Sequence, residues 1–151
     1  AIEYTITHGV RWPEDDETRF SQMPPFAGAL SDAQLDAVVD HVLSLSGKAQ
    51  PSSAGAQVFA DNCAACHGPQ AKGGRDVGAP NLSDAIWLRG GDRADLKRQI
   101  LNPRMGAMPA WGERLDPVTI KMLAAYVHSL GGGEDFVEVA DNPEVEVDEQ
   151  P

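Results

Sequence analysis

The chain has two cysteines, which stand three positions apart, and a histidine follows the second one directly. The motif reads Cys63-Ala64-Ala65-Cys66-His67. Side chains of these types at this spacing serve as zinc ligands, as a thiol redox pair, as a disulfide bridge or as the attachment point of haem. Each use makes a different demand on the rest of the chain, so this motif constrains the fold more than any other feature.

Three of the four uses fit the surrounding sequence poorly. A structural zinc site needs four ligands, but the remaining histidines, His8, His41 and His128, have no second cysteine pair beside them. A redox pair of the thioredoxin kind follows a strand, whereas the flanks here are helical and rich in glycine. A disulfide across two intervening residues closes almost no loop and would stabilise the fold little.

Covalent haem attachment gives the spacing a physical reason. Two thiols on one helical turn can both reach vinyl groups on one edge of a porphyrin, and the imidazole of the next residue is then directed at the iron. We therefore expect Cys63 and Cys66 to carry a haem c and His67 to be an axial ligand of its iron.

The second axial ligand should come from far along the chain, because folding then closes over the opposite face of the haem. Met108, in the sequence GAMPAW, is the first choice, and Met105 is the substitute. The carbonyl of Pro80 is expected to accept the Nδ1 proton of His67, which would fix the histidine tautomer and raise its basicity.

With a histidine and a methionine both bound, the iron of such a haem has no vacant position. Oxygen binding and peroxide cleavage are therefore disfavoured, and one-electron transfer remains. No nucleophile or acid–base pair points to catalysis by the chain itself. The indole N–H groups of Trp87 and Trp111 are candidates to reach a buried propionate, with simple packing as the alternative.

Two segments of the chain match each other at a constant offset of 85 residues. The first begins at Met23 and the second at Met108; the Met-Pro pair, most apolar positions and the closing glycine superpose without a gap. We interpret the match as a duplication. It makes Met23 the counterpart of the expected iron ligand.

Each copy predicts one helix with a recognisable start. In the first copy Ser31 and Gln34 form a capping box, and in the second Asp116 is the N-cap while Pro117 takes the first helical position. Apolar residues then recur at i, i+3, i+4 and i+7, so each helix needs a partner on one face.

A candidate partner for the second helix lies around the cysteines. Gly55, Phe59 and Cys63 recur every four residues and form one stripe of a short helix. Because glycine lets another backbone cross closely, we expect Leu123 or Tyr126 of the second copy to fill that crossing.

The charge of the chain is concentrated at one end. The formal net charge is −11, and residues 134–151 hold eight carboxylates without a lysine or arginine. Nothing basic suggests a nucleic-acid partner. No apolar run approaches the roughly 18 residues that a membrane span needs. The acidic end is expected to be disordered.

The motifs together resemble a known family. The segment from Ser53 to Gly132, with Gly55 and Phe59, CAACH, APNL, MPAW and LAAYVHSL, resembles a class I cytochrome c domain. With the preceding THGVRWPEDDETRFSQMPPF and the later APNLSDAIWLRGG, the chain resembles more narrowly the di-haem subunit III, or P subunit, of bacterial cbb(3)-type cytochrome c oxidases.

This resemblance implies an all-α, class I cytochrome c fold, with short helices around a covalently bound haem c. Residues 53–132 are then a complete cytochrome c domain, 48–52 a linker and 133–151 the acidic tail. Residues 1–47 are the C-terminal half of a truncated, duplicated cytochrome c domain, which must rest on the complete domain, on a second chain or on a missing fragment.

The resemblance also implies a function and a location. Such a subunit works on the periplasmic side of the bacterial inner membrane and passes electrons from a cytochrome bc complex or a soluble cytochrome c to the other oxidase subunits. It is held to the membrane by an upstream anchor that this chain lacks. A free soluble electron carrier, the cytochrome subunit of a dehydrogenase, and a haem sensor or peroxidase are the alternatives.

The resemblance does not determine which methionine ligates which haem. The full-length family member carries two haems, and its two halves are capable of exchanging methionines crosswise. Met23 then caps the haem held by Cys63, Cys66 and His67, and Met108 caps the haem that is missing here.

Overall fold

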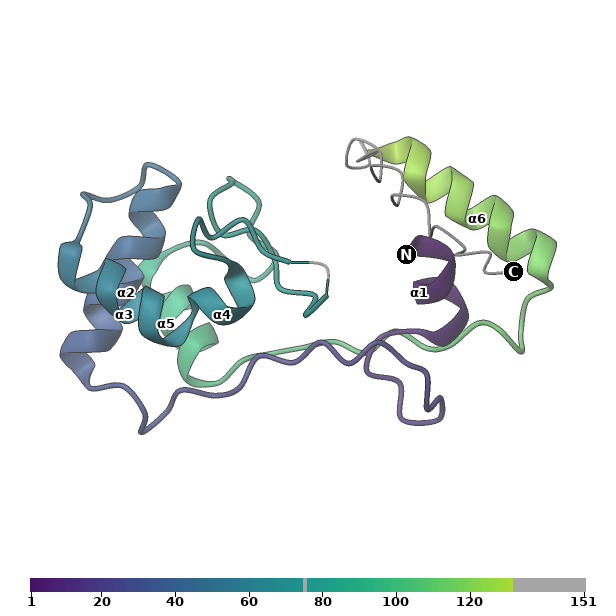
Figure 1. Ribbon diagram of the computed structural model, residues 1–151, viewed down its shortest axis with the longest axis horizontal. Helices are drawn as coiled ribbons and strands as arrows, with labels where there is room; N and C mark the ends of the chain where they lie inside the picture. The colour runs from purple at the N-terminus through teal and green to yellow at the C-terminus, as the bar shows by residue number, and fades with distance from the viewer. Residues whose placement is uncertain (75, 132–151) are drawn as a thin grey trace, which may run out of the picture.

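A computed structural model of the chain describes residues 1–74 and 76–131, and this part is helical, as expected (Figure 1). Its helices are α1 (Ile2–His8), α2 (Asp32–Leu45), α3 (Ser53–Asn62), α4 (Ala64–His67), α5 (Arg93–Leu101) and α6 (Pro117–Leu130). Extended backbone pairs only in isolated bridges within these ranges. None of the described helices is both long and apolar enough to cross a membrane. The tail predicted at 133–151 lies outside the described residues.

The helices form two groups. The larger lobe consists of α2, α3, α4 and α5, and the smaller lobe consists of α1 and α6 (Figure 1). Two extended segments run side by side between the lobes: one leads from α1 to α2, and the other leads from α5 to α6. Each lobe therefore combines helices from distant parts of the sequence.

The two repeated helices begin where the sequence predicts. The Ser31 side chain accepts the Gln34 backbone N–H while the Gln34 side chain accepts the Ser31 backbone N–H, so the capping box is present. The Asp116 side chain accepts the backbone N–H groups of Val118 and Thr119, with Pro117 in the first turn. α2 and α6 are each 14 residues long.

The crossing on α3 is occupied by a different helix from the one expected. A Cβ placed on Gly55 would lie 2.0 Å from the carbonyl oxygen of Ala37, so α2 passes directly over this glycine. The prediction that Leu123 or Tyr126 fills the crossing is wrong, since α6 makes no contact with α3 among the described residues. The segment after α5 carries α6 away to α1 instead.

The same helical face is buried in one copy and exposed in the other. In α2, Val38 and Val39 are fully buried and pack with Phe59 of α3 in the core of the larger lobe. In α6, Ile120 is buried, but Tyr126 is 60% exposed. The smaller lobe thus leaves uncovered most of the face that α2 buries.

Backbone hydrogen bonds connect the two matching segments with the helices in crosswise form. The N–H of Phe26, in the first copy, donates to the carbonyl of Ile100 at the end of α5 over 3.1 Å. The N–H of Trp111, the counterpart of Phe26 at the 85-residue offset, donates to the carbonyl of Ile6 near the end of α1, also over 3.1 Å. Each repeated segment is therefore docked on the helix that precedes the other one.

Candidate functional site

The cysteine–histidine motif occupies the junction of two helices. Cys63 is both the C-cap of α3 and the N-cap of α4, and its carbonyl accepts the backbone N–H of Cys66 over 3.2 Å and of His67 over 2.9 Å. These bonds hold both thiols and the imidazole on one helical turn. Cys66 is exposed and Cys63 is partly exposed, while His67 is 9% exposed and lies in the larger lobe.

The imidazole of His67 is held by the loop that follows it. Its Nδ1 lies 3.0 Å from the carbonyl oxygen of Pro80, the contact expected from the sequence. A carbonyl can only accept, so Nδ1 carries the proton and the lone pair lies on Nε2, which is the form that ligates metals. The reciprocal 3.1 Å bonds between Gly74 and Ala79 close the loop that presents Pro80.

The cysteines do not have the character of a redox pair. Burial, with a smaller effect of the neighbouring Cys66, raises the pKa of the Cys63 thiol to about 11. Reactive thiols instead have pKa values below the ordinary one. The zinc alternative also lacks ligands, because no cluster of three or more His, Cys, Asp or Glu side chains fit for a metal ion occurs within 1–74 and 76–131.

One buried donor in the larger lobe has no partner. The indole Nε1 of Trp87 is buried and unpaired among the described residues, although Trp87 packs against the core. A buried N–H without an acceptor is rare in folded proteins and calls for a group that satisfies it. A haem propionate is such an acceptor. Together with two adjacent free thiols and the tautomer of His67, this orphaned donor fits a covalently bound haem.

The two candidate methionines lie on the two segments between the lobes and have different neighbours. The N–H of Met23 lies 3.4 Å from the Sδ of Met105, and the Ser21 hydroxyl, two residues earlier, donates to the carbonyl of Gly78 over 3.1 Å. Met108 instead exchanges backbone hydrogen bonds of 2.9 and 3.0 Å with Val10. The segment with Met23 thus approaches the loop that presents Pro80, and the segment with Met108 lies beside α1.

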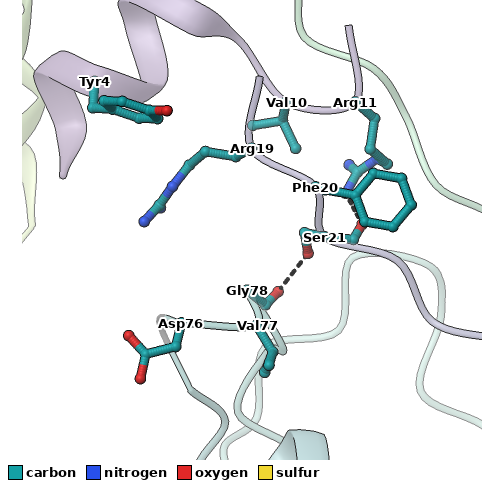
Figure 2. Close-up of a pocket in the computed structure, with 9 residues that line it drawn as sticks. All are labelled: Tyr4, Val10, Arg11, Arg19, Phe20, Ser21, Asp76, Val77 and Gly78. Carbon is teal, nitrogen blue, oxygen red and sulfur yellow. Dashed lines mark hydrogen bonds between the residues drawn. The ribbon is translucent and has the colours of Figure 1, made fainter. Parts of the chain in front are cut away.

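An open cavity of about 480 Å³ separates the lobes (Figure 2). It is lined by Tyr4 of α1, by residues of the segment between α1 and α2, and by the loop before Pro80; these are Val10, Arg11, Arg19, Phe20, Ser21, Asp76, Val77 and Gly78. The lining includes two arginines and one carboxylate, so it carries more basic than acidic side chains in an acidic protein.

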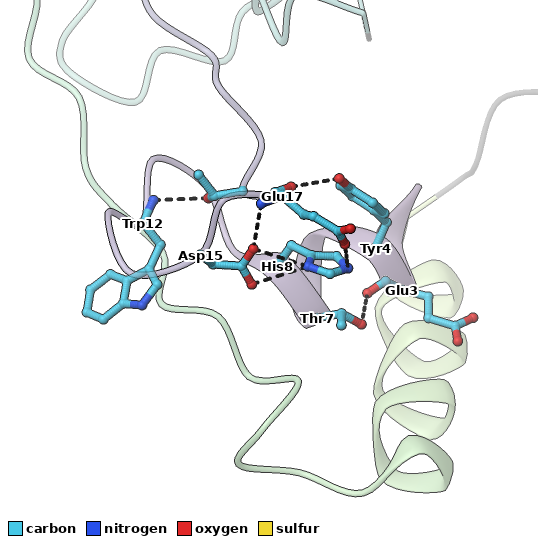
Figure 3. A network of polar contacts seen from close by, with 8 residues as sticks. Glu3, Tyr4, Thr7, His8, Trp12, Asp15 and Glu17 are labelled. Carbon is cyan, nitrogen blue, oxygen red and sulfur yellow. Dashed lines mark hydrogen bonds and ion pairs between the residues drawn. The ribbon is translucent and has the colours of Figure 1, made fainter.

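A polar network at the end of α1 was not foreseen from the sequence. His8 places Nδ1 3.2 Å from Asp15 and Nε2 3.1 Å from Glu17, and its side chain is 21% exposed (Figure 3). The hydroxyl of Tyr4 donates to the carbonyl of Glu17 over 2.6 Å. The network folds the loop after α1 back onto that helix. The run of acidic residues after Pro13 is the sequence feature that could have indicated this network.

Comparison with known proteins identifies relatives of one kind. The family model described as cytochrome C oxidase, cbb3-type, subunit III matches residues 50–127. The cbb3-type cytochrome c oxidase subunit CcoP of Cereibacter sphaeroides is 52% identical over 139 residues, which cover 89% of this chain and 48% of that protein. The subunit FixP of Rhizobium meliloti is 52% identical over 136 residues, covering 88% of this chain and 47% of FixP.

A further relative, the subunit CcoP of an Azospirillum species, is 50% identical over 146 residues, which cover 88% of this chain and 49% of that protein. The chain spans about half the length of the curated relatives it matches.

Proposed function

Because the chain belongs to the subunit III family of cbb3-type cytochrome c oxidases, we propose that it carries one haem c on Cys63 and Cys66 and transfers single electrons within such an oxidase. The geometry of α4 supports this most directly. One turn presents two thiols and a buried imidazole whose Nδ1 is already bonded to the carbonyl of Pro80.

The residues have distinct tasks around the bound haem, which supplies the one-electron chemistry. Cys63 and Cys66 fix its position covalently, and His67 offers Nε2 to the iron. The Pro80 carbonyl keeps the Nδ1 proton in place and strengthens the imidazole as a donor. With a methionine on the other face no coordination position stays open, so the chain itself performs no catalysis.

We infer that Met23, rather than our first choice Met108, caps this haem. The segment with Met23 is bonded to Ile100 at the end of α5 through Phe26 and to Gly78 through Ser21. These contacts all belong to the lobe that holds His67. Met108 is bonded to Val10, beside α1, and is assigned to a second haem, as expected for the full-length family member.

The domain division follows from the same exchange. We propose that 1–47 and 53–132 are two copies of a cytochrome c domain, the first incomplete, with 48–52 as a linker. In the folded chain each copy lends its last helix to the other: α2 packs on α3 and α5, and α6 packs on α1.

The proposed setting is the periplasmic side of the bacterial inner membrane. The names of the relatives describe subunits of a cbb3-type oxidase. We propose the other subunits of such an oxidase as electron acceptors. A cytochrome bc complex or a soluble cytochrome c is the proposed donor, and an upstream anchor is the proposed link to the membrane.

The intact mass of the chain, expressed with haem attachment machinery and measured under denaturing conditions, tests the cofactor. The mass should exceed that of the polypeptide by one haem, and the excess should vanish in a Cys63→Ser, Cys66→Ser double variant. A colourless wild-type chain without the excess would overturn the proposed function.

Separate replacement of the methionines tests the axial ligand. Met23→Ala should abolish the far-red methionine–iron charge-transfer band of the oxidised protein and admit carbon monoxide to the reduced protein. Met108→Ala is the matched control and should leave the band intact. Loss of the band in the Met108 variant alone would return the assignment to Met108.

A further inference from the structure

Arg11 occupies an unusual backbone position just after α1. Its φ is 53°, in the left-handed region that side chains other than glycine seldom adopt. Its N–H donates to the carbonyl of Arg19 over 2.9 Å, which closes the base of the loop after α1. Such a conformation costs free energy and persists where surrounding contacts hold it.

The side chain of Arg11 provides those contacts. Its Nε donates to the carbonyl of Gly106 over 2.7 Å, a bond between residues 95 positions apart. Its Nη1 donates to the carbonyl of Ser21, which lies beside it in Figure 2. One guanidinium therefore joins the segment that leads to α2 and the segment that leads to α6.

Both segments carry methionines next to these bonds. Ser21 lies two residues before Met23, and Gly106 lies between Met105 and Met108. The Ser21 hydroxyl continues the chain of contacts to the carbonyl of Gly78, in the loop that ends at the partner of His67 (Figure 2). The guanidinium thus adds a side-chain link to the backbone bonds between Val10 and Met108, and through Ser21 it connects the two segments with the loop beside the haem site.

We propose that Arg11 is a positioning residue for the axial methionine, holding Ser21 and Gly106 together so that Met23 stays on the distal face of the haem. This role rests on the proposed haem and on its ligation by Met23. It makes the closure of the haem face depend on a side chain of the segment that follows α1.

The chemistry of the contact favours arginine over lysine. The guanidinium is planar and directs Nε–H and Nη1–H in fixed directions, so it holds two carbonyls at a set spacing. A lysine ammonium carries the same charge but is a mobile point donor and does not reproduce this fork. Charge and geometry can therefore be separated by substitution.

The test compares Arg11→Ala, Arg11→Gly and Arg11→Lys in the haem-loaded chain. The competition of added imidazole for ferric iron reports how firmly methionine is bound. We expect Arg11→Ala to bind imidazole about tenfold more tightly, which corresponds to about 1.4 kcal/mol, and to weaken the far-red band. Arg11→Lys should restore at most part of the difference.

Arg11→Gly separates the side chain from the backbone. Glycine adopts a φ of 53° without strain, so this variant should keep its helix content and its covalent haem while still binding imidazole more tightly. The matched control is Arg104→Ala, an exposed arginine on the segment between α5 and α6, which should match the wild type.

The outcomes separate this inference from the proposed function. Wild-type imidazole affinity and an intact band in Arg11→Ala and Arg11→Gly, together with loss of the band in Met23→Ala, would overturn the role of Arg11 alone. A wild-type chain without covalent haem, or a band that survives Met23→Ala, would overturn the haem or ligand assignment beneath it.

Discussion

Two side chains of the larger lobe are arranged for a group that protein atoms do not supply. His67 is buried with its Nε2 free, because Nδ1 is bonded to Pro80. Trp87 is partly buried, and its buried indole N–H has no acceptor in the described part of the chain. An unpaired buried donor is costly, and it becomes favourable once a propionate accepts its hydrogen bond.

Replacing Trp87 by phenylalanine should therefore cost more stability in the haem-loaded protein than in the haem-free chain. The haem-loaded protein should lose about 1.5–3 kcal/mol of unfolding free energy, since a hydrogen bond to a charged propionate is lost. The haem-free chain should lose less, because there the N–H is unpaired. Denaturant unfolding of both forms measures the difference, and Trp111→Phe serves as the control. Equal losses in both forms would contradict the assignment of a propionate partner.

The sequence predicts which residue types form the site and how they are spaced. It predicts less well which distant segment closes over the site. The thiols, the imidazole and the contact between His67 and Pro80 all lie within one short stretch of sequence, so local sequence patterns can predict them. The choice between Met23 and Met108 depends on which copy's loop closes over which lobe. Their surroundings in the sequence are duplicated, so the pattern holds no information that separates them.

At the scale of elements, the crossing of α2 and α3 brings two helix backbones into close contact in the larger lobe. The bare Cα of Gly55 faces the backbone carbonyl of Ala37, and the ring of His41 lies 5.3 Å from the ring of Phe59. On the other side of α2, Arg93 of α5 forms ion pairs with Asp36 and Asp40. Exposed pairs of this kind stabilise little but fix register.

A methyl group at Gly55 should disrupt this crossing. Gly55→Ala places a Cβ 2.0 Å from a backbone oxygen, so α2 must move away, and we expect a loss of about 1–3 kcal/mol or more despite the better helix propensity of alanine. Gly131→Ala, with no atom of the described residues within 4 Å of the new Cβ, should change stability by less than about 0.5 kcal/mol. Thermal unfolding of the haem-loaded variants compares them.

The same crossing should respond to pH through His41. Burial lowers the pKa of His41 from its ordinary value of 6.5. Below 6.5 the unfolded chain therefore binds this proton more readily than the folded chain, so stability should fall as pH falls through that value and level off below the folded pKa. Denaturant midpoints of the wild type and His41→Gln, measured from pH 8 to about 5, isolate the effect. A parallel pair of curves would contradict it.

The two repeated helices were predictable, but their partners were not. Caps at Ser31 and Asp116 and the spacing of apolar residues locate α2 and α6. An amphipathic face indicates that a helix packs against a partner, but it does not identify that partner. Because both copies present the same face to the same kind of acceptor, Gly55 accepts α2 as well as it would accept α6. The connecting segments determine which helix packs on Gly55. Because these segments lack a periodic pattern, the pairing could not be predicted from the sequence.

At the scale of the whole molecule, the two lobes differ in how much apolar surface they bury. α2 buries five residues of its repeated face, whereas α6 buries one, Ile120. On α6, Met122 and Leu130 are 68% and 67% exposed. The smaller lobe therefore has less to hold it together in this chain.

Amide hydrogen exchange should reveal this difference directly. We expect amides in the middle of α6 to exchange at least about tenfold faster than those in the middle of α2, because local opening exposes less new apolar surface. The two helices are matched controls for each other, since both are 14 residues long and side-chain capped. Equal protection in the isolated chain would contradict the expectation.

The crosswise connection sets an order of events during biosynthesis. A ribosome produces α2 before α3, α4 and α5, so all helices of the larger lobe exist as soon as α5 has emerged. α1 is made earlier than any of them, yet its partner is α6, the final helix in the described chain. The half that holds His67 can thus mature on a nascent polypeptide, while α1, made before it, waits for α6.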